Sequence, residues 1–234
     1  MHEHKVVSSE QWLAASRALL VKEKELTRLR DQLSEQRRSL PWEAVTKDYV
    51  FEGPRGTQTL AELFDGRSQL IVYHFMFPPS WDDGCPHCSF WADNFDGIDV
   101  HLNHRDVTFV AISRAPLAQL ATYRERMGWS FSWVSSSNTD FNFDYNVSFT
   151  SDQLADGFSC YNHGTLAPGM EDREGVSVFI NDGGQILHTY SAYARGIDML
   201  NGAYQFLDLV PKGRDEAGQD NPQFWVRRHH EYDS

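Results

Sequence analysis

The most constraining feature of the sequence is a long apolar run that leads directly into a cysteine pair. Residues 70–77 read LIVYHFMF and are followed by two prolines. A short run this rich in β-branched and aromatic side chains is typical of a strand that is buried on both faces. Cys85 and Cys88 follow in a C-x-x-C arrangement, and a helix is predicted over residues 86–95. We therefore expect the cysteines at the junction between a central strand and a helix.

Strands and helices continue to alternate beyond this junction. The sequence predicts a second buried strand over residues 107–112, a helix over about 116–127 and a strand over 131–134. A hairpin with the turn sequence NDGG covers residues 176–190, and a final helix covers about 198–209. Strands that alternate with helices form βαβ units, so we expect an α/β domain whose sheet contains parallel strands.

The pattern divides the chain into a helical arm at residues 1–40, an α/β domain at 41–211 and a C-terminal tail at 212–234. The arm is predicted to be one long helix over residues 9–38. Its apolar residues recur near helical spacing and are Trp12, Leu13, Leu19, Leu20, Leu26, Leu29 and Leu33. So narrow a stripe needs a partner surface, which is either the helix's own domain or a second copy in a homodimer. The tail is expected to pack on the domain or on a partner subunit.

The charge balance argues against two classes of partner. The chain carries 33 acidic and 21 basic residues, a formal net charge of −12 with histidine neutral. Such a balance repels the phosphates of nucleic acids and anionic lipid surfaces. The apolar run at 70–77 is much shorter than the roughly 20 residues of a membrane-spanning helix, and the N-terminus lacks the pattern of a secretory signal. We therefore expect a cytoplasmic protein with no nucleic-acid or membrane partner.

Only three cysteines occur, which is too few for a disulfide scaffold in 234 residues. Two of them have the spacing of a redox pair. At a helix N-terminus, the first sulfur faces free backbone N–H groups and the positive end of the helix dipole, which favour the thiolate. Cys85 is therefore the predicted nucleophile. Cys88, one turn later, is positioned to attack a mixed disulfide on Cys85 and release the partner as a thiol.

The neighbours of the pair tune this chemistry in opposite directions. Pro86 fits the first turn of the helix, and a protonated His87 would add positive charge beside the sulfur. Asp82 and Asp83 add negative charge nearby. Trp81 is predicted to line an apolar groove for the substrate.

Other functions remain open at this stage. A metal site would need two more ligands, because zinc prefers four-coordinate sites and one C-x-x-C pair supplies two of them. The candidate additional ligands for zinc or copper are Cys160, His163, His188, His229 and His230. No second ligand motif accompanies them, so the reading without a metal or any other cofactor is preferred. A non-enzymatic partner-binding protein is the main rival to a redox enzyme.

Longer motifs carry a family resemblance. The tetrapeptide Cys85-Pro86-His87-Cys88 resembles that of disulfide-exchange proteins of the thioredoxin-like superfamily. The motifs GCPHCSFWADNFDG at 84–97, MGW at 127–129, DFNFD at 140–144 and YARGIDMLNG at 193–202 resemble the bacterial thioredoxin-like family catalogued as domain of unknown function 899. The resemblance covers nearly the whole chain. It implies a thioredoxin-like central mixed sheet flanked by helices, with a peroxiredoxin-like elaboration.

The sequence departs from the better-known relatives at two places. Thioredoxins carry a cis-proline just before the hairpin strand, whereas residues 173–176 here read REGV. Peroxiredoxins carry a threonine three residues before the reactive cysteine, where Asp82 stands. The sequence thus predicts a thiol–disulfide oxidoreductase acting on a disulfide-containing protein or on a small thiol or peroxide, with thiol peroxidase activity as an alternative.

Overall fold

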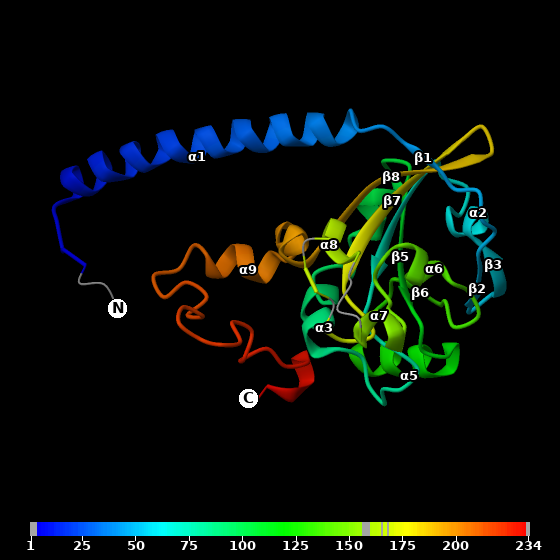
Figure 1. The fold of residues 1–234 in the computed structure, drawn as a ribbon. Helices are drawn as coiled ribbons and strands as arrows, with labels where there is room; N and C mark the ends of the chain where they lie inside the picture. The colour runs from blue at the N-terminus through cyan, green and yellow to red at the C-terminus, as the bar shows by residue number, and fades with distance from the viewer. Residues whose placement is uncertain (1–3, 156–159, 165, 168, 233–234) are drawn as a thin grey trace. The chain divides into compact units, whose positions relative to one another are not determined.

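The computed structural model describes residues 4–155, 160–164, 166–167 and 169–232 (Figure 1). The chain forms two compact units, Met1–Pro41 and Trp42–Ser234. The first contains the long helix α1, Ser9–Arg38, which confirms the predicted N-terminal helix. Ser8 accepts a hydrogen bond from the Gln11 backbone, and the Gln11 side chain accepts one from the Ser8 backbone. This reciprocal capping box satisfies two N–H groups that the first helical turn leaves free.

The second unit is built on a mixed sheet. Within its described residues, eight strands follow the order β1-β8-β7-β4-β5-β6-β2-β3. The strands are β1 Glu43–Ala44, β2 Val50–Gly53, β3 Gly56–Thr59, β4 Gln69–His74, β5 Val107–Ser113, β6 Ser132–Ser135, β7 Gly175–Asp182 and β8 Gln185–Tyr193. Strand β5 pairs in parallel with β4 and β6, whereas β7 is antiparallel to both β4 and β8. Three parallel strands joined to a final antiparallel hairpin form the thioredoxin-like arrangement, which confirms the predicted fold.

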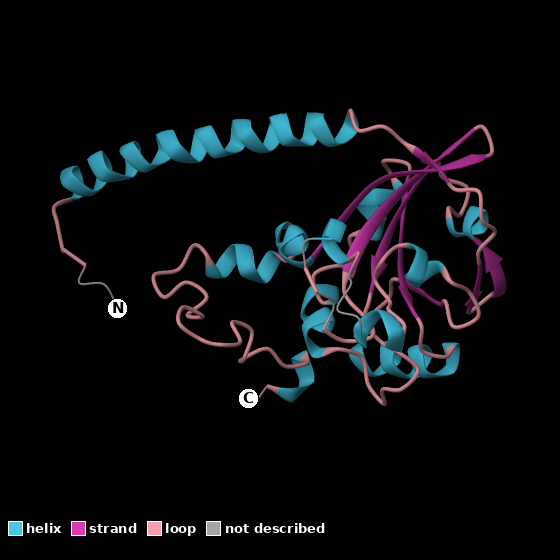
Figure 2. Ribbon diagram, viewed as in Figure 1, coloured by secondary structure: helices cyan, strands magenta, loops and turns pink. Residues whose placement is uncertain are grey.

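Helices lie on both sides of this sheet (Figure 2). They are α2 Leu60–Leu63, α3 Pro86–Ala92, α4 Asp99–Asn103, α5 Leu117–Met127, α6 Phe141–Asp144, α7 Ser151–Ala155, α8 Tyr161–Gly164 and α9 Gly202–Leu207, with 3-10 turns η1 Ala194–Leu200 and η2 His229–Glu231. Two predicted boundaries were wrong. The helix predicted over 86–95 ends at Ala92, and the one predicted over 198–209 is divided at Asn201. Asn201 adopts an extended backbone, and its side chain caps α9 by accepting from the Tyr204 backbone, so a new helix starts there.

The central strand is shorter than predicted. Strand β4 ends at His74, because its neighbour β7 begins at Gly175, directly opposite. The next three residues stay buried: the Phe75 N–H still donates to the Ile112 carbonyl of β5, whereas the Met76 carbonyl accepts from the Cys85 N–H. The chain therefore separates from β7 at His74 but follows β5 as far as Phe77, whose carbonyl accepts from the Ala115 N–H.

Alternate side chains of β4 enter two different hydrophobic clusters. Tyr73 packs in the cluster that also contains both cysteines, whereas Leu70 and Val72 pack in the cluster on the other face. His74 lies on this second face, stacked on the Phe141 ring at a centroid distance of 5.7 Å. Alternation along a strand explains this division. In the part of the chain that the structure describes, no helix is both long and apolar enough to cross a membrane.

Candidate active site

The two cysteines lie where the chain passes from β4 into α3. Cys85 is the N-cap of α3, and Pro86 occupies the first turn, where a missing N–H group costs nothing. The Cys85 backbone N–H donates to the Met76 carbonyl at 3.1 Å, while the Met76 N–H points at the Cys88 sulfur at 3.4 Å. The Cys88 N–H points at the Cys85 sulfur at 3.5 Å. Both sulfurs therefore receive backbone donors, and both thiols are free.

A hydrogen-bonded network holds this turn from behind. Ser89 Oγ donates to the Cys85 carbonyl at 2.9 Å and bonds the Tyr123 hydroxyl at 2.8 Å. Gly84 leaves no room for a side chain, because a Cβ atom there would lie 2.8 Å from the Phe75 ring and 3.1 Å from the Tyr123 ring. The position of Cys85 is thus set by close packing of the preceding residue.

The electrostatics of the pair are asymmetric. A hydrogen bond with the Cys88 thiol lowers the pKa of Cys85 well below its usual range, with further help from His87 and the Cys88 backbone, and these effects outweigh burial. Burial raises the pKa of Cys88, and the neighbouring Cys85 raises it further. A hydrogen bond with Cys85 raises the pKa of His87 against the effect of burial. The arrangement therefore favours a thiolate at Cys85, an imidazolium at His87 and a neutral thiol at Cys88.

The nearby carboxylates are partly neutralised. Asp83 pairs with Arg126, and its other oxygen lies 4.0 Å from Arg228. The expectation that Asp82 and Asp83 oppose the positive surroundings of the sulfur therefore applies only in part to Asp83, whose charge has two cationic neighbours.

A pocket of about 1030 Å³ opens onto the pair. Cys85 and Cys88 are 5% and 2% exposed, so a reactant reaches them through this pocket. The predicted groups Trp81, Pro86 and His87 line it together with both cysteines. Its other walls are Tyr73, Met76, Trp91, Met170, Arg173, Glu174, Ala194, Arg195, Ile197, Asp198, Tyr204, Asp208, Lys212, Arg214, Asp215, Glu216, Ala217, Asn221, Pro222 and Gln223. Its size is that of sites for small molecules.

The sequence did not indicate that Glu174 belongs to this site. Glu174 lies just before β7, at the place where thioredoxins have their cis-proline, and it lines the pocket. Burial raises its pKa, and the negative charge of Cys85 adds to the effect. No peptide bond among the described residues is cis. The only signal in the sequence was the polar REGV stretch, which lacks the proline and contains this acid.

The proposed metal ligands have other partners. His188 bonds Ser191 at 2.8 Å and packs against the Tyr145 ring, and His229 bonds Asp93 at 2.8 Å. Cys160 is exposed. Among the described residues, no group of three or more His, Cys, Asp or Glu side chains is arranged to hold a metal ion.

Comparison with known proteins gives one family match and a set of distant structural relatives. The chain is similar in fold to peroxidoxin BcpB from Mycobacterium tuberculosis, with 15% identity over 68% of this chain and 92% of that one at a TM-score of 0.47. A mutant of PrxQ from Xylella fastidiosa is 12% identical over 70% of this chain and 95% of that one, with a TM-score of 0.46. A mutant of peroxiredoxin 6 of Arenicola marina is 12% identical over 66% of this chain and 65% of that one, also with a TM-score of 0.46. No curated protein sequence matches. The family described as "bacterial protein of unknown function (DUF899)" matches over residues 1–232, and the chain therefore belongs to this family.

Proposed function

We propose that the protein is a thiol–disulfide oxidoreductase that reduces small disulfides with Cys85 and Cys88. The observation that carries this proposal is the placement of two inequivalent thiols in one pocket. The Cys85 sulfur is the N-cap acceptor of α3 and bonds both Cys88 and His87, whereas Cys88 is kept neutral by burial. A thiolate with a neutral thiol beside it is the arrangement that two-step disulfide exchange needs.

The reaction begins with the thiolate. Cys85 attacks one sulfur of the substrate disulfide, forming a mixed disulfide and releasing the other half as a thiolate, which takes a proton from the His87 imidazolium. Neutral His87 then accepts the proton of Cys88. The new thiolate attacks the Cys85 sulfur, the second substrate half leaves and is protonated by His87, and a Cys85–Cys88 disulfide remains. The substrate gains two electrons and two protons, both lost by the enzyme.

The pocket favours small substrates over folded proteins. Both sulfurs are at least nine-tenths buried, and access is through a cavity of about 1030 Å³. A disulfide on a flat protein surface would not reach them, whereas a low-molecular-weight disulfide would enter. Cellular thiols in the cytoplasm, where the sequence predicts the chain to act, would return the enzyme to the reduced state.

Trapping the intermediate tests this proposal. In a Cys160→Ser background, which removes the exposed thiol, Cys88→Ser is expected to form a stable one-to-one adduct with glutathione disulfide at Cys85, detected by intact-protein mass spectrometry. The chain that retains Cys88 should instead accumulate an internal disulfide without an adduct, because Cys88 displaces the bound thiol. A Cys85→Ser, Cys160→Ser chain should form no adduct in the pocket.

Two outcomes would contradict the proposal. Equal labelling of the chains with and without Cys85 would show that this sulfur is not the reactive group. Faster oxidation of the pair by a hydroperoxide than by glutathione disulfide would replace disulfide exchange with a peroxidase function.

The preference for small substrates is tested with insulin as the protein disulfide, which should be reduced more slowly than glutathione disulfide.

A further inference from the structure

The C-terminal segment, residues 212–232, forms part of the catalytic pocket. Its pocket-lining residues include Gln223, which shares the pocket with His87, and a hydrogen bond with the Gln223 backbone contributes to the raised pKa of His87. The same ring bonds the Cys85 sulfur. An imidazolium has two N–H donors, so a backbone acceptor and a thiolate can both be satisfied by it. Gln223 therefore forms the part of the pocket wall that lies beside His87 and Cys85.

Several contacts keep this part of the segment in place. The Gln223 side chain donates to the Tyr204 hydroxyl at 3.0 Å, and the Trp225 indole donates to Glu216 at 2.8 Å. The Trp225 ring also meets the Phe90 ring of α3 at a centroid distance of 5.3 Å. Val226 is 2% exposed and belongs to the same hydrophobic cluster as the cysteines. The segment is thus packed against α3 through Trp225 and against α9 through Gln223.

A second anchor lies on the other side of the cysteine turn. Arg228 donates to the Gly84 carbonyl and to the Tyr123 hydroxyl, each at 2.8 Å. Tyr123 bonds Ser89, which in turn donates to the Cys85 carbonyl. One guanidinium therefore ties the end of the chain to the residue before the nucleophile and to the network that supports it.

We infer that the C-terminal segment is a positioning element of the active site, in which Arg228 fixes the turn before Cys85 and Gln223 forms the pocket wall beside His87. This inference deepens the proposed function and rests on it for its chemical meaning. Glu174 and Cys88 act on the charges of Cys85 and His87, and the Tyr73 hydroxyl faces both cysteines. The other charged groups that line the pocket are Arg173, Arg195, Asp198 and Asp208 and, within the segment, Lys212, Arg214, Asp215 and Glu216, which both double variants leave in place. Loosening the segment should therefore act on the Cys85 thiolate through His87.

The test compares two double variants of the full chain that remove the same kinds of side chain. Trp225→Ala with Arg228→Ala releases two anchors, whereas Phe224→Ala with Arg227→Ala removes an exposed ring and an exposed guanidinium from the same segment. The readout is the pH dependence of Cys85 alkylation by iodoacetamide in a Cys160→Ser background. We expect the first variant to raise the pKa of Cys85, slowing alkylation at pH 6 about tenfold, and the second to leave it unchanged.

A cycle with His87→Ala separates positioning from general destabilisation. If the segment acts through His87, releasing the anchors in the His87→Ala chain should slow alkylation no further. Arg228→Ala alone is a milder change and should also raise the pKa of Cys85 that the pH dependence of alkylation reports. The inference is overturned if Trp225→Ala with Arg228→Ala leaves the pH dependence of Cys85 alkylation unchanged. It is also overturned if this double variant slows alkylation as much in the His87→Ala chain as in the chain that retains His87. Because alkylation requires no disulfide substrate, a failure of disulfide exchange would leave this result interpretable.

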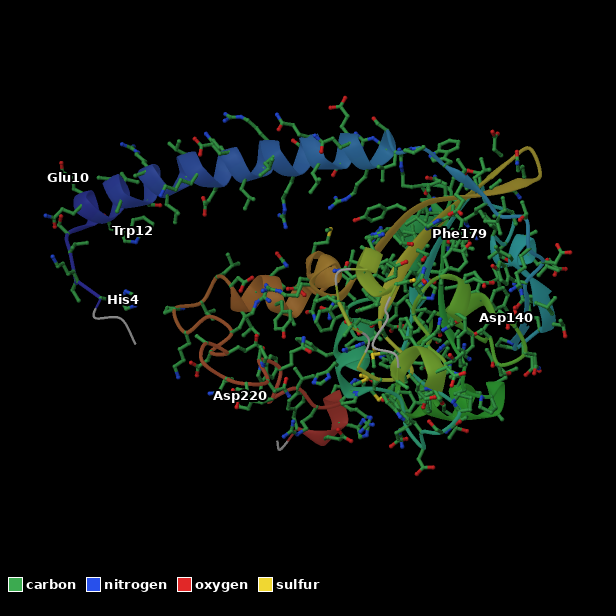
Figure 3. All side chains as sticks on the ribbon, viewed as in Figure 1. His4, Glu10, Trp12, Asp140, Phe179 and Asp220 are labelled. Carbon is green, nitrogen blue, oxygen red and sulfur yellow. The ribbon has the colours of Figure 1, made fainter. Side chains whose placement is uncertain are left out.

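The long N-terminal helix carries a second inference. Within α1, Trp12, Leu19, Leu26 and Leu33 recur at every seventh position, and no residue of the helix is buried. Leu29 follows Leu26 by three residues and is 60% exposed, so it extends the same stripe. The Trp12 side chain projects from the helix in Figure 3. A seven-residue repeat that holds at four successive positions is typical of a coiled-coil seam.

Two charged residues beside the stripe favour a second copy of α1 as its partner. With the four residues of the repeat as position a, Glu25 falls at position g and Arg30 at position e of the next heptad. In a parallel two-stranded coiled coil these two positions face each other across the helices, and the two-fold axis makes the pair occur twice. We propose that α1 forms a parallel coiled-coil dimer with α1 of a second copy.

Sedimentation equilibrium on the full chain tests this dimer. Glu25→Arg or Arg30→Glu alone should weaken dimerisation about tenfold, because each places like charges opposite one another, and the two together should restore it. Leu26→Ala should weaken it on the order of 100-fold. The matched control is Lys24→Glu with Asp31→Lys, an exchange of charge on the outer face that should change nothing. A monomeric wild-type chain, or a dimer that these seam variants leave intact, overturns the proposal.

Discussion

Replacing Cys85 by serine is expected to abolish the reduction of glutathione disulfide, lowering kcat/KM by at least about 10³-fold. The sulfur of Cys85 receives the Cys88 N–H and the His87 ring, which together favour a thiolate at neutral pH. A serine hydroxyl at the same place stays protonated and is a much weaker nucleophile, so no mixed disulfide forms. Coupled oxidation of a dithiol reductant, followed at fixed pH, gives the rate.

The matched control is Cys160→Ser, which removes the exposed thiol outside the pocket and should leave the rate unchanged. Removing Cys88 together with Cys85 should lower the rate no further than removing Cys85 alone, because the two thiols act in one reaction sequence. Retention of most of the activity by Cys85→Ser would show that the reaction does not pass through this pair.

The position of Cys85 and Cys88 could be predicted from the sequence because the residues that determine it are close to them in the chain. An apolar run, a break and a helix start lie within 25 residues of one another, roughly the length at which periodicity and capping are informative. Residues 70–77 and Pro86 therefore placed the cysteines at a strand–helix junction, where the structure has them. The strand's end at His74 was not predictable in this way, since it is set by the start of β7 opposite it.

The surroundings of the pair could not be predicted, because they come from distant parts of the chain. Glu174 reaches the pocket only because β7 lies beside β4, and Gln223 reaches His87 only because the C-terminal segment folds back onto α3. Neither residue has a local pattern that marks it as part of a site. Hydrogen bonds between residues so far apart depend on tertiary packing, which a single sequence encodes only collectively.

His74 illustrates the same limitation, since the sequence placed it in a buried strand without showing its partners. Its Nε2 atom bonds Ser177 Oγ at 2.9 Å, and a chain of hydroxyls continues through Ser191 to His188. Its Nδ1 atom is buried and has no hydrogen-bond partner among the residues that the structure describes. Two aromatic rings, Phe141 and Tyr145, stack on the imidazole. Such a site accepts neutral histidine and excludes its cation.

Acidification from pH 7 to pH 4 is therefore expected to destabilise the protein by roughly 3 kcal/mol through His74 alone. Burial lowers the pKa of His74 from 6.5 to about 3, with a smaller effect from His188. The unfolded chain takes up a proton near pH 6.5, whereas the folded chain stays neutral until about pH 3. The free energy of unfolding thus falls as the pH drops through this window and is unaffected by His74 above it. Urea unfolding at pH 7 and pH 4, with the thiols kept reduced, measures the change.

Other groups titrate in the same range, so the effect is read as a difference between chains. Burial raises the pKa of Glu174 and Asp172, which opposes the loss of stability on acidification, whereas hydrogen bonds lower the pKa of Glu62 and Asp106, which adds to it. His74→Phe keeps an aromatic ring in the stack, removes the buried nitrogen that lacks a partner and leaves those carboxyls in place.

The wild-type chain should lose roughly 3 kcal/mol more than His74→Phe between pH 7 and pH 4. The matched control, His101→Phe, changes an exposed histidine and should lose as much as the wild type. Equal losses in all three chains would mean that His74 is protonated in the folded state at pH 4, and that the second face of the sheet admits water or a counter-charge at this position. A smaller loss in His74→Phe means instead that the aromatic stack around β4 holds only while this histidine is neutral.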